Sequence, residues 1–177
     1  MASGKAHATA SLLLTLPAGL LAFGLGGDFS AAVACATGSL AGLILSPDLD
    51  VPQRTHSNYI MYELLGRIGG GLWFAFWWPY SRMIPHRSPL SHWPILGTLG
   101  RLLYIIVLSA PLWYGFTWFW FGAGSNLPTP NPVVTTWLGW AILGLILSDI
   151  LHFVMDNMPA FRQHRRPWWQ RMMRRIF

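Results

Sequence analysis

Histidine and aspartate residues gather in two short motifs of this 177-residue chain. Asp48 and Asp50 lie in "SPDLDVP", and Asp149 and Asp156 lie on either side of His152 in "DILHFVMD". These motifs hold four of the six acidic residues of the chain. Imidazole nitrogen and carboxylate oxygen together form the ligand set of Zn²⁺, Mn²⁺ or Fe²⁺. A single cysteine excludes both a thiolate cluster and a disulfide within the chain.

The spacing of these residues favours a shared site. Asp149, His152 and Asp156 are separated by three and then four positions, so they project from one face of a helix. Such a face offers a metal two or three ligands from one rigid element. In "SPDLDVP" two carboxylates flank one residue between prolines. That turn could aim Asp48 at a metal while Asp50 orients a neighbouring histidine.

Three more histidines stand at the beginnings of apolar stretches. His7 opens the first stretch, and His86 and His92 lie in "HRSPLSHWP" before the third. Each alone has a plainer interpretation as a cap, a turn residue or a polar contact between helices. Ionisable groups at span ends are costly and are usually paired or functional, so their shared placement favours a site. His56 and His164 lie among polar or basic neighbours, and we interpret both as solvated.

The elements that position these motifs are predicted from hydropathy. Hydrophobic residues make up 53% of the chain and charged residues 10%, the composition of a membrane protein. Four stretches are long enough to span the membrane, 9–26, 29–46, 95–121 and 133–151. A fifth segment, 66–80, opens with glycines and has Arg67 and Arg82 at its borders, which favours an interfacial or re-entrant helix. The predicted fold is all-α, a polytopic membrane helical bundle of about four spans plus this helix.

Basic residues predict the orientation of the bundle. Lys5 lies near the N-terminus, four arginines lie within the 47–94 segment, and six of the eleven arginines lie in the tail. The positive-inside rule therefore places both termini and the 47–94 segment on the cytoplasmic side of the membrane. Residues 1–160 form the expected membrane-embedded metal-binding domain. Residues 161–177, with paired tryptophans among the arginines, form a basic amphipathic tail suited to anionic lipid rather than nucleic acid.

As a set, the motifs resemble the membrane-bound metal-dependent hydrolases of the YdjM type, and still more closely their relatives described as predicted metal-binding membrane proteins. The resemblance covers about residues 1–160 and implies an integral helical protein of the inner membrane, distantly related to zinc-dependent phospholipase C and P1 nuclease. One departure is that His86 and His92 differ by six positions, where the hydrolase pattern His-Arg-Gly-x-Thr-His has five, and Ser88 replaces the glycine. The metal ligands that the resemblance implies are His7, Asp48, His86, His92, His152 and Asp156, with Asp50 and Asp149 as further ligands or supporting partners.

The resemblance leads to the hypothesis that the protein hydrolyses a phosphoester at the cytoplasmic face of the membrane. The substrate could be a phosphoester that is linked to a lipid. One or two divalent ions, with zinc expected first and manganese or iron as alternatives, would acidify a bound water and polarise a phosphoryl oxygen. Asp50 or Asp149 would act as general base. Arg87 would clamp the phosphate, since its planar fork matches phosphate oxygens, or would instead anchor a lipid headgroup.

Two other classes of function stay open. The first is a non-catalytic membrane subunit or assembly factor with a structural metal site, which the short loops and tryptophan-rich sequence also fit. The second is a metal-ion carrier, which is disfavoured because carriers place their ligands near the bilayer midplane. The expected partners are membrane lipids, and other membrane proteins or further copies of the chain. Nucleic acid is not an expected partner.

Overall fold

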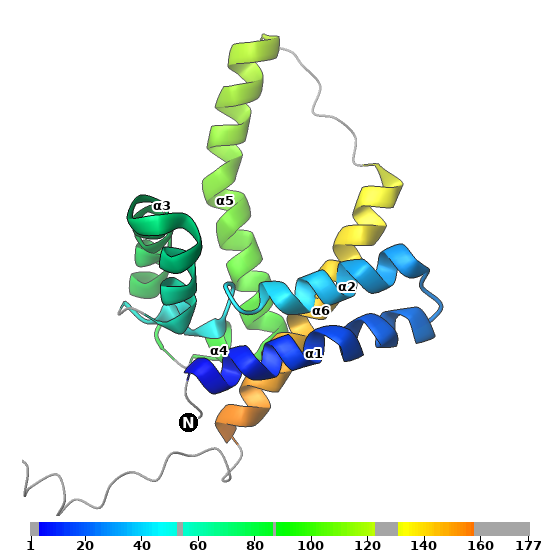
Figure 1. The fold of residues 1–177 in the computed structure, drawn as a ribbon. Helices are drawn as coiled ribbons and strands as arrows, with labels where there is room; N and C mark the ends of the chain where they lie inside the picture. The colour runs from blue at the N-terminus through cyan, green and yellow to red at the C-terminus, as the bar shows by residue number, and fades with distance from the viewer. Residues whose placement is uncertain (1–3, 53–54, 87, 123–130, 158–177) are drawn as a thin grey trace, which may run out of the picture.

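The computed structural model describes residues 4–52, 55–86, 88–122 and 131–157, and every regular element in these ranges is helical. The helices lie at angles to one another, with α5 and α6 diverging away from the end where the chain begins (Figure 1). The elements are α1 (Gly4–Gly24), α2 (Phe29–Ala41), the 3₁₀ helix η1 (Pro47–Asp50), α3 (His56–Met83), α4 (Pro89–His92), α5 (Pro94–Phe121) and α6 (Pro132–Asn157).

Three of these helices, α1, α5 and α6, are long and apolar enough to cross a membrane. The second expected span, 29–46, differs from expectation because its α-helix stops at Ala41 after 13 residues. Tight turns follow, in which the backbone N–H of Gly42 bonds to the carbonyl of Ser39. Thirteen residues rise only about 20 Å, short of the roughly 30 Å hydrocarbon layer. The all-helical prediction is confirmed, with three long apolar helices and one short one.

Helix α2 packs closely on α6 through small residues. Gly38 lies against the carbonyl of Ala141, and Gly144 lies against the carbonyl of Cys35. A Cβ at either glycine would overlap these oxygens, so the two backbones approach each other where no side chain intervenes. Helix α1 lies beside α2, and a buried hydroxyl contact of 2.9 Å joins Ser11 of α1 to Ser148 of α6. This three-helix unit fixes the start of α1 against the end of α6.

Helix α3 is a hairpin of two helices. Gly66 has φ = 69°, a conformation that favours glycine, and the chain reverses there, so that Gly70 packs against Tyr62. The predicted helix 66–80 thus lies mainly in the second arm, and α3 is not among the helices with the length and hydropathy of a span. The second arm packs on η1 through a buried cluster of Leu49, Trp77 and Tyr80.

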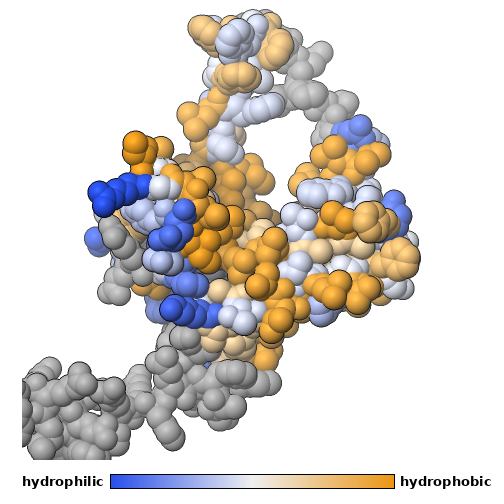
Figure 2. Space-filling view, in the orientation of Figure 1, coloured by the Kyte–Doolittle hydropathy of each residue, from blue (hydrophilic) through white to orange (hydrophobic). Residues whose placement is uncertain are grey.

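Apolar side chains cover much of the outer surface. Leu16 of α1 and Leu112 of α5 are 71% and 77% exposed, and many other large apolar residues are similarly open. Figure 2 shows hydrophilic residues gathered over α3 and the start of α1, while the flank of the α1–α2 hairpin is mostly hydrophobic. Apolar exposure on this scale fits a lipid solvent, not water. The structure therefore supports association with a membrane.

Candidate metal centre

Four segments bring seven of the predicted side chains together. The beginning of α1, the helix η1, the segment around α4 and the last turns of α6 all contribute. The side chains form three overlapping triads, in each of which the ligand atoms lie within 4.8 Å of one another. The triads are His7, His152 and Asp156; Asp48, His92 and His152; and Asp50, His86 and His92.

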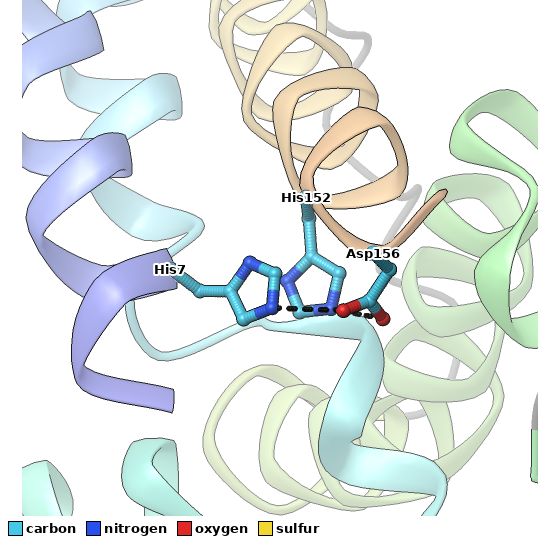
Figure 3. Close-up of side chains that lie close together, drawn as sticks. All are labelled: His7, His152 and Asp156. Atoms are coloured by element: carbon cyan, nitrogen blue, oxygen red, sulfur yellow. Dashed lines mark hydrogen bonds and ion pairs between the residues drawn. The ribbon is translucent and has the colours of Figure 1, made fainter. Parts of the chain in front are cut away.

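The first triad joins the first turn of α1 to the last turns of α6 (Figure 3). The imidazoles of His7 and His152 are stacked, with ring centroids 3.8 Å apart and planes 13° apart. Both rings direct Nε2 toward Asp156, at 3.1 Å from His7 and 3.7 Å from His152. His152 and Asp156 are one helical turn apart, as their spacing predicts.

Asp48 lies at the centre of the second triad. Its Oδ1 is 3.7 Å from Nε2 of His152 and 4.0 Å from Nε2 of His92. Ligand atoms about 2.1 Å from a tetrahedral zinc ion stand roughly 3.4 Å apart, so these separations, slightly longer, suit a shared cation. Asp48 is only partly buried, which leaves one side of this triad toward solvent.

In the third triad, the Asp50 carboxylate contacts both histidines. One carboxylate oxygen is 2.8 Å from Nδ1 of His86, and the other is 3.3 Å from Nδ1 of His92. Since Nδ1 of His92 is engaged here, its Nε2 is the nitrogen left to bind a metal with Asp48. This is the arrangement in which a carboxylate orients a ligand histidine. The geometry favours an orienting role for Asp50 over the predicted role of general base.

The local sequence explains why η1 presents two carboxylates in different directions. Ser46 caps this helix by accepting a hydrogen bond from the backbone N–H of Asp48, and Pro47 occupies the first helical turn. Three residues make one turn of a 3₁₀ helix, so Asp48 and Asp50 diverge by about two thirds of a turn. One carboxylate therefore faces α6 while the other faces the segment around α4.

The two carboxyl groups of η1 also differ in acidity. Burial raises the pKa of Asp48, and the nearby imidazoles of His7 and His92 offset this only in part. Burial also acts to raise the pKa of Asp50, but hydrogen bonds from His92 and His86 outweigh it and hold that pKa below its usual value. Asp50 is thus the more firmly ionised of the two, as an orienting carboxylate must be.

Two unpartnered nitrogens indicate that the cluster fits a cation. Within the described ranges, Nε2 of His92 and Nε2 of His152 are buried and have no hydrogen-bond partner. A buried polar atom without a partner is costly, and a bound cation would remove that cost. Both atoms face carboxylate oxygens, and imidazole with carboxylate is a zinc, manganese or iron ligand set. The residues present therefore fit a divalent metal.

Asp149 lies apart from these triads, one turn before His152 on α6. Its Oδ2 accepts hydrogen bonds from the hydroxyl of Thr98 and the guanidinium of Arg101, both on α5. All three side chains are fully buried. The ion pair accounts for Asp149 without a metal, and the geometry favours a supporting role over that of ligand or base.

Arg101 and Thr98 are the residues that sequence reasoning missed. An arginine inside an apolar stretch is itself a signal of a buried partner or a functional site, and that signal was present.

Arg87, the predicted phosphate clamp, lies outside the described residues, as does the basic tail 161–177. His86 is the most exposed imidazole of the cluster, at 38% of its side chain.

Comparison with known proteins gives a family. Residues 2–166 match the family described as "Uncharacterized metal-binding protein (DUF2227)". The chain belongs to this family. A relative from Aquifex aeolicus (strain VF5), described as "Uncharacterized protein", is 32% identical over 132 residues, which is 69% of this chain and 86% of the relative. No solved structure matches the chain. Membership of the metal-binding family and the His/Asp triads agree on the kind of ligand that the site takes.

Proposed function

We propose that this protein is a metal-dependent hydrolase of phosphoesters, including lipid-linked ones, at the cytoplasmic face of the inner membrane. The observation that carries the proposal is the set of three linked His/Asp triads, with unpartnered Nε2 atoms on His92 and His152. A bound divalent ion would supply Lewis acidity toward a phosphoryl oxygen and an acidified water. Zinc is the first ion to test, with manganese and iron next.

The chain's own residues have distinct parts in this proposal. Asp48, His92 and His152 hold the ion at the partly open triad, with His7 and Asp156 at the adjoining one. Asp50 orients the imidazoles of His86 and His92 through their Nδ1 atoms. The exposed edge of the cluster, on the side of Asp48 and His86, is where a substrate would enter.

The position of the cluster favours an amphiphilic substrate. His7 lies in the first turn of α1 and Asp156 in the last turn of α6, so the ligands gather at one end of the long apolar helices. Helix ends of this kind lie at the boundary between lipid and water. A phosphoester whose headgroup lies at that boundary could reach the cluster without leaving the membrane.

Turnover by the reconstituted protein tests the proposal. The detergent-purified protein is stripped with a chelator, reloaded with zinc or manganese, and assayed with bis-(p-nitrophenyl) phosphate and with a phospholipid in mixed micelles. We expect hydrolysis that requires the metal and is lost in Asp48→Asn. A control variant, Asp28→Asn, changes an acidic cap of α2 that is not in the triads and should retain activity. Full metal occupancy without hydrolysis of either substrate would favour the structural-metal alternative.

A further inference from the structure

An aromatic wall stands next to the metal cluster and contains buried polar groups without partners. Rings of Trp73, Phe76, Trp77, Tyr80 and Tyr104 contact one another with centroids 5.1 to 5.6 Å apart. The second arm of α3 supplies four of these rings, and α5 supplies the fifth. The wall packs on Leu49, which lies between the two carboxylates of η1.

The unpartnered groups in this region are mainly hydrogen-bond donors. Within the described ranges they include the indole N–H of Trp73 and of Trp77, the hydroxyl of Tyr80, and Nε and Nη1 of Arg101. One oxygen of Asp149 is the unpartnered acceptor beside them. Buried donors without partners are costly unless a ligand or ordered water satisfies them. An excess of donors calls for a ligand rich in acceptor oxygens.

Tyr80 connects this donor set with the metal cluster. The side chain is 2% exposed. Its ring lies 5.1 Å from that of Tyr104, which follows Arg101 by about one turn of α5, and it packs on Leu49, the residue before Asp50 in η1. Burial raises the pKa of the Tyr80 hydroxyl, which therefore stays protonated and able to donate at neutral pH. Asp149 engages only Nη2 of Arg101, so the other two nitrogens keep their donor capacity.

We propose that the Tyr80 hydroxyl and the Arg101 guanidinium form an oxyanion-binding position beside the metal cluster. This inference rests on the proposed function, because the oxyanion would be the phosphoryl group of the substrate. Arginine binds phosphate oxygens through its planar set of N–H groups, and a phenol adds a directed donor. Tyr80 and Arg101 would thus bind the phosphate oxygens, the role that the sequence analysis predicts for Arg87. These two residues would contact the phosphoryl oxygens, while the His/Asp ligands would bind the divalent cation.

Binding of inorganic phosphate to the zinc-loaded protein in detergent tests this position. Isothermal titration compares wild type with Tyr80→Phe, while zinc content is measured in parallel. Tyr104→Phe is the matched control, since it removes the same atom from the same wall, but the Tyr104 hydroxyl already donates to the carbonyl of Phe76. We expect Tyr80→Phe to weaken phosphate binding about tenfold, the loss of one hydrogen bond to a charged group, with zinc content unchanged. Tyr104→Phe should change it less than about twofold.

A second variant and the assay of turnover separate the outcomes. Arg101→Lys keeps the charge but loses the planar fork, and it should also weaken phosphate binding at full zinc content. Equal phosphate affinity in wild type and Tyr80→Phe would overturn the inference, as would a loss of zinc in Tyr80→Phe or a wild type that binds no phosphate. Tyr80-dependent phosphate binding without ester turnover would retain this position and reject the proposed hydrolase function.

Discussion

The Nδ1 atom of His92 lies 3.3 Å from a buried carboxylate oxygen of Asp50, and Nε2 of the same ring lies 4.0 Å from Asp48. One aspartate therefore contacts the imidazole at Nδ1, while the other faces Nε2, the nitrogen that we propose as the metal ligand. This division between two residues of the same short helix determines which nitrogen of His92 can bind a metal. It also makes Asp50 important to the site without requiring that Asp50 touch the ion.

Asp50→Asn should weaken metal binding without abolishing it. The amide can accept a hydrogen bond at one atom only, so it cannot hold both His86 and His92 by their Nδ1 atoms. Loss of such an orienting partner typically costs about 10-fold to 100-fold in metal affinity. Competition with a chromophoric chelator measures the change. Unaltered affinity would show that Asp50 does not orient the ligands.

Metal binding should weaken as the pH falls from about 7.5 to about 5.5, because imidazole and carboxylate ligands bind only when deprotonated. Burial raises the pKa of Asp48, so a proton competes with the metal for that carboxylate at a higher pH than for an ordinary aspartate. Titration calorimetry in buffers of different ionisation enthalpy should therefore record proton release on binding. Affinity that is constant over this range would contradict the ligand assignment.

The buried pair of Arg101 and Asp149 should be needed for stability as a pair. Arg101→Leu leaves the Asp149 carboxylate buried without its counter-charge and should lower the free energy of unfolding by about 3–5 kcal/mol. The double variant Arg101→Leu/Asp149→Leu removes both charges and should recover much of that loss. Denaturation in mild detergent measures both. A double variant as unstable as the single one would show that the two charges are not coupled.

Close packing of α2 on α6 should tolerate no added methyl group. Gly38→Ala places a Cβ against the Ala141 carbonyl and should cost about 1–3 kcal/mol through overpacking. Gly139→Ala is the matched control on α6, since a Cβ there meets nothing within 4 Å. We expect its thermal midpoint to stay equal or to rise, because alanine favours a helix. Equal midpoints for the two variants would argue against the crossing.

Much of this architecture could be predicted from the sequence. The helical period of "DILHFVMD" placed His152 and Asp156 on one face, and the structure brings seven predicted residues from four segments to one cluster. The ligand roles of these residues stay predictions. Hydropathy also located the long helices, because apolar stretches of about 20 residues have few other structures open to them.

Other features depend on contacts that no local pattern contains. The end of α2 at Ala41 depends on turns within a continuous apolar stretch, and the reversal of α3 depends on one glycine with positive φ. The pairing of Asp149 with Arg101 joins two residues that are 48 positions apart on different helices, so helical spacing alone could only group Asp149 with the metal-site residues His152 and Asp156. The split between Asp48 and Asp50 likewise follows from which neighbours each carboxylate meets in three dimensions.

Elemental analysis of the detergent-purified protein tests the central claim most directly. The comparison is between wild type, His152→Ala, Asp48→Ala and the control His56→Ala, whose ring lies outside the triads and stacks near Tyr59. We predict near-stoichiometric zinc, manganese or iron in wild type and in His56→Ala, and its loss from the other two variants. A folded wild type without metal, or equal metal in all four proteins, would contradict the shared metal centre.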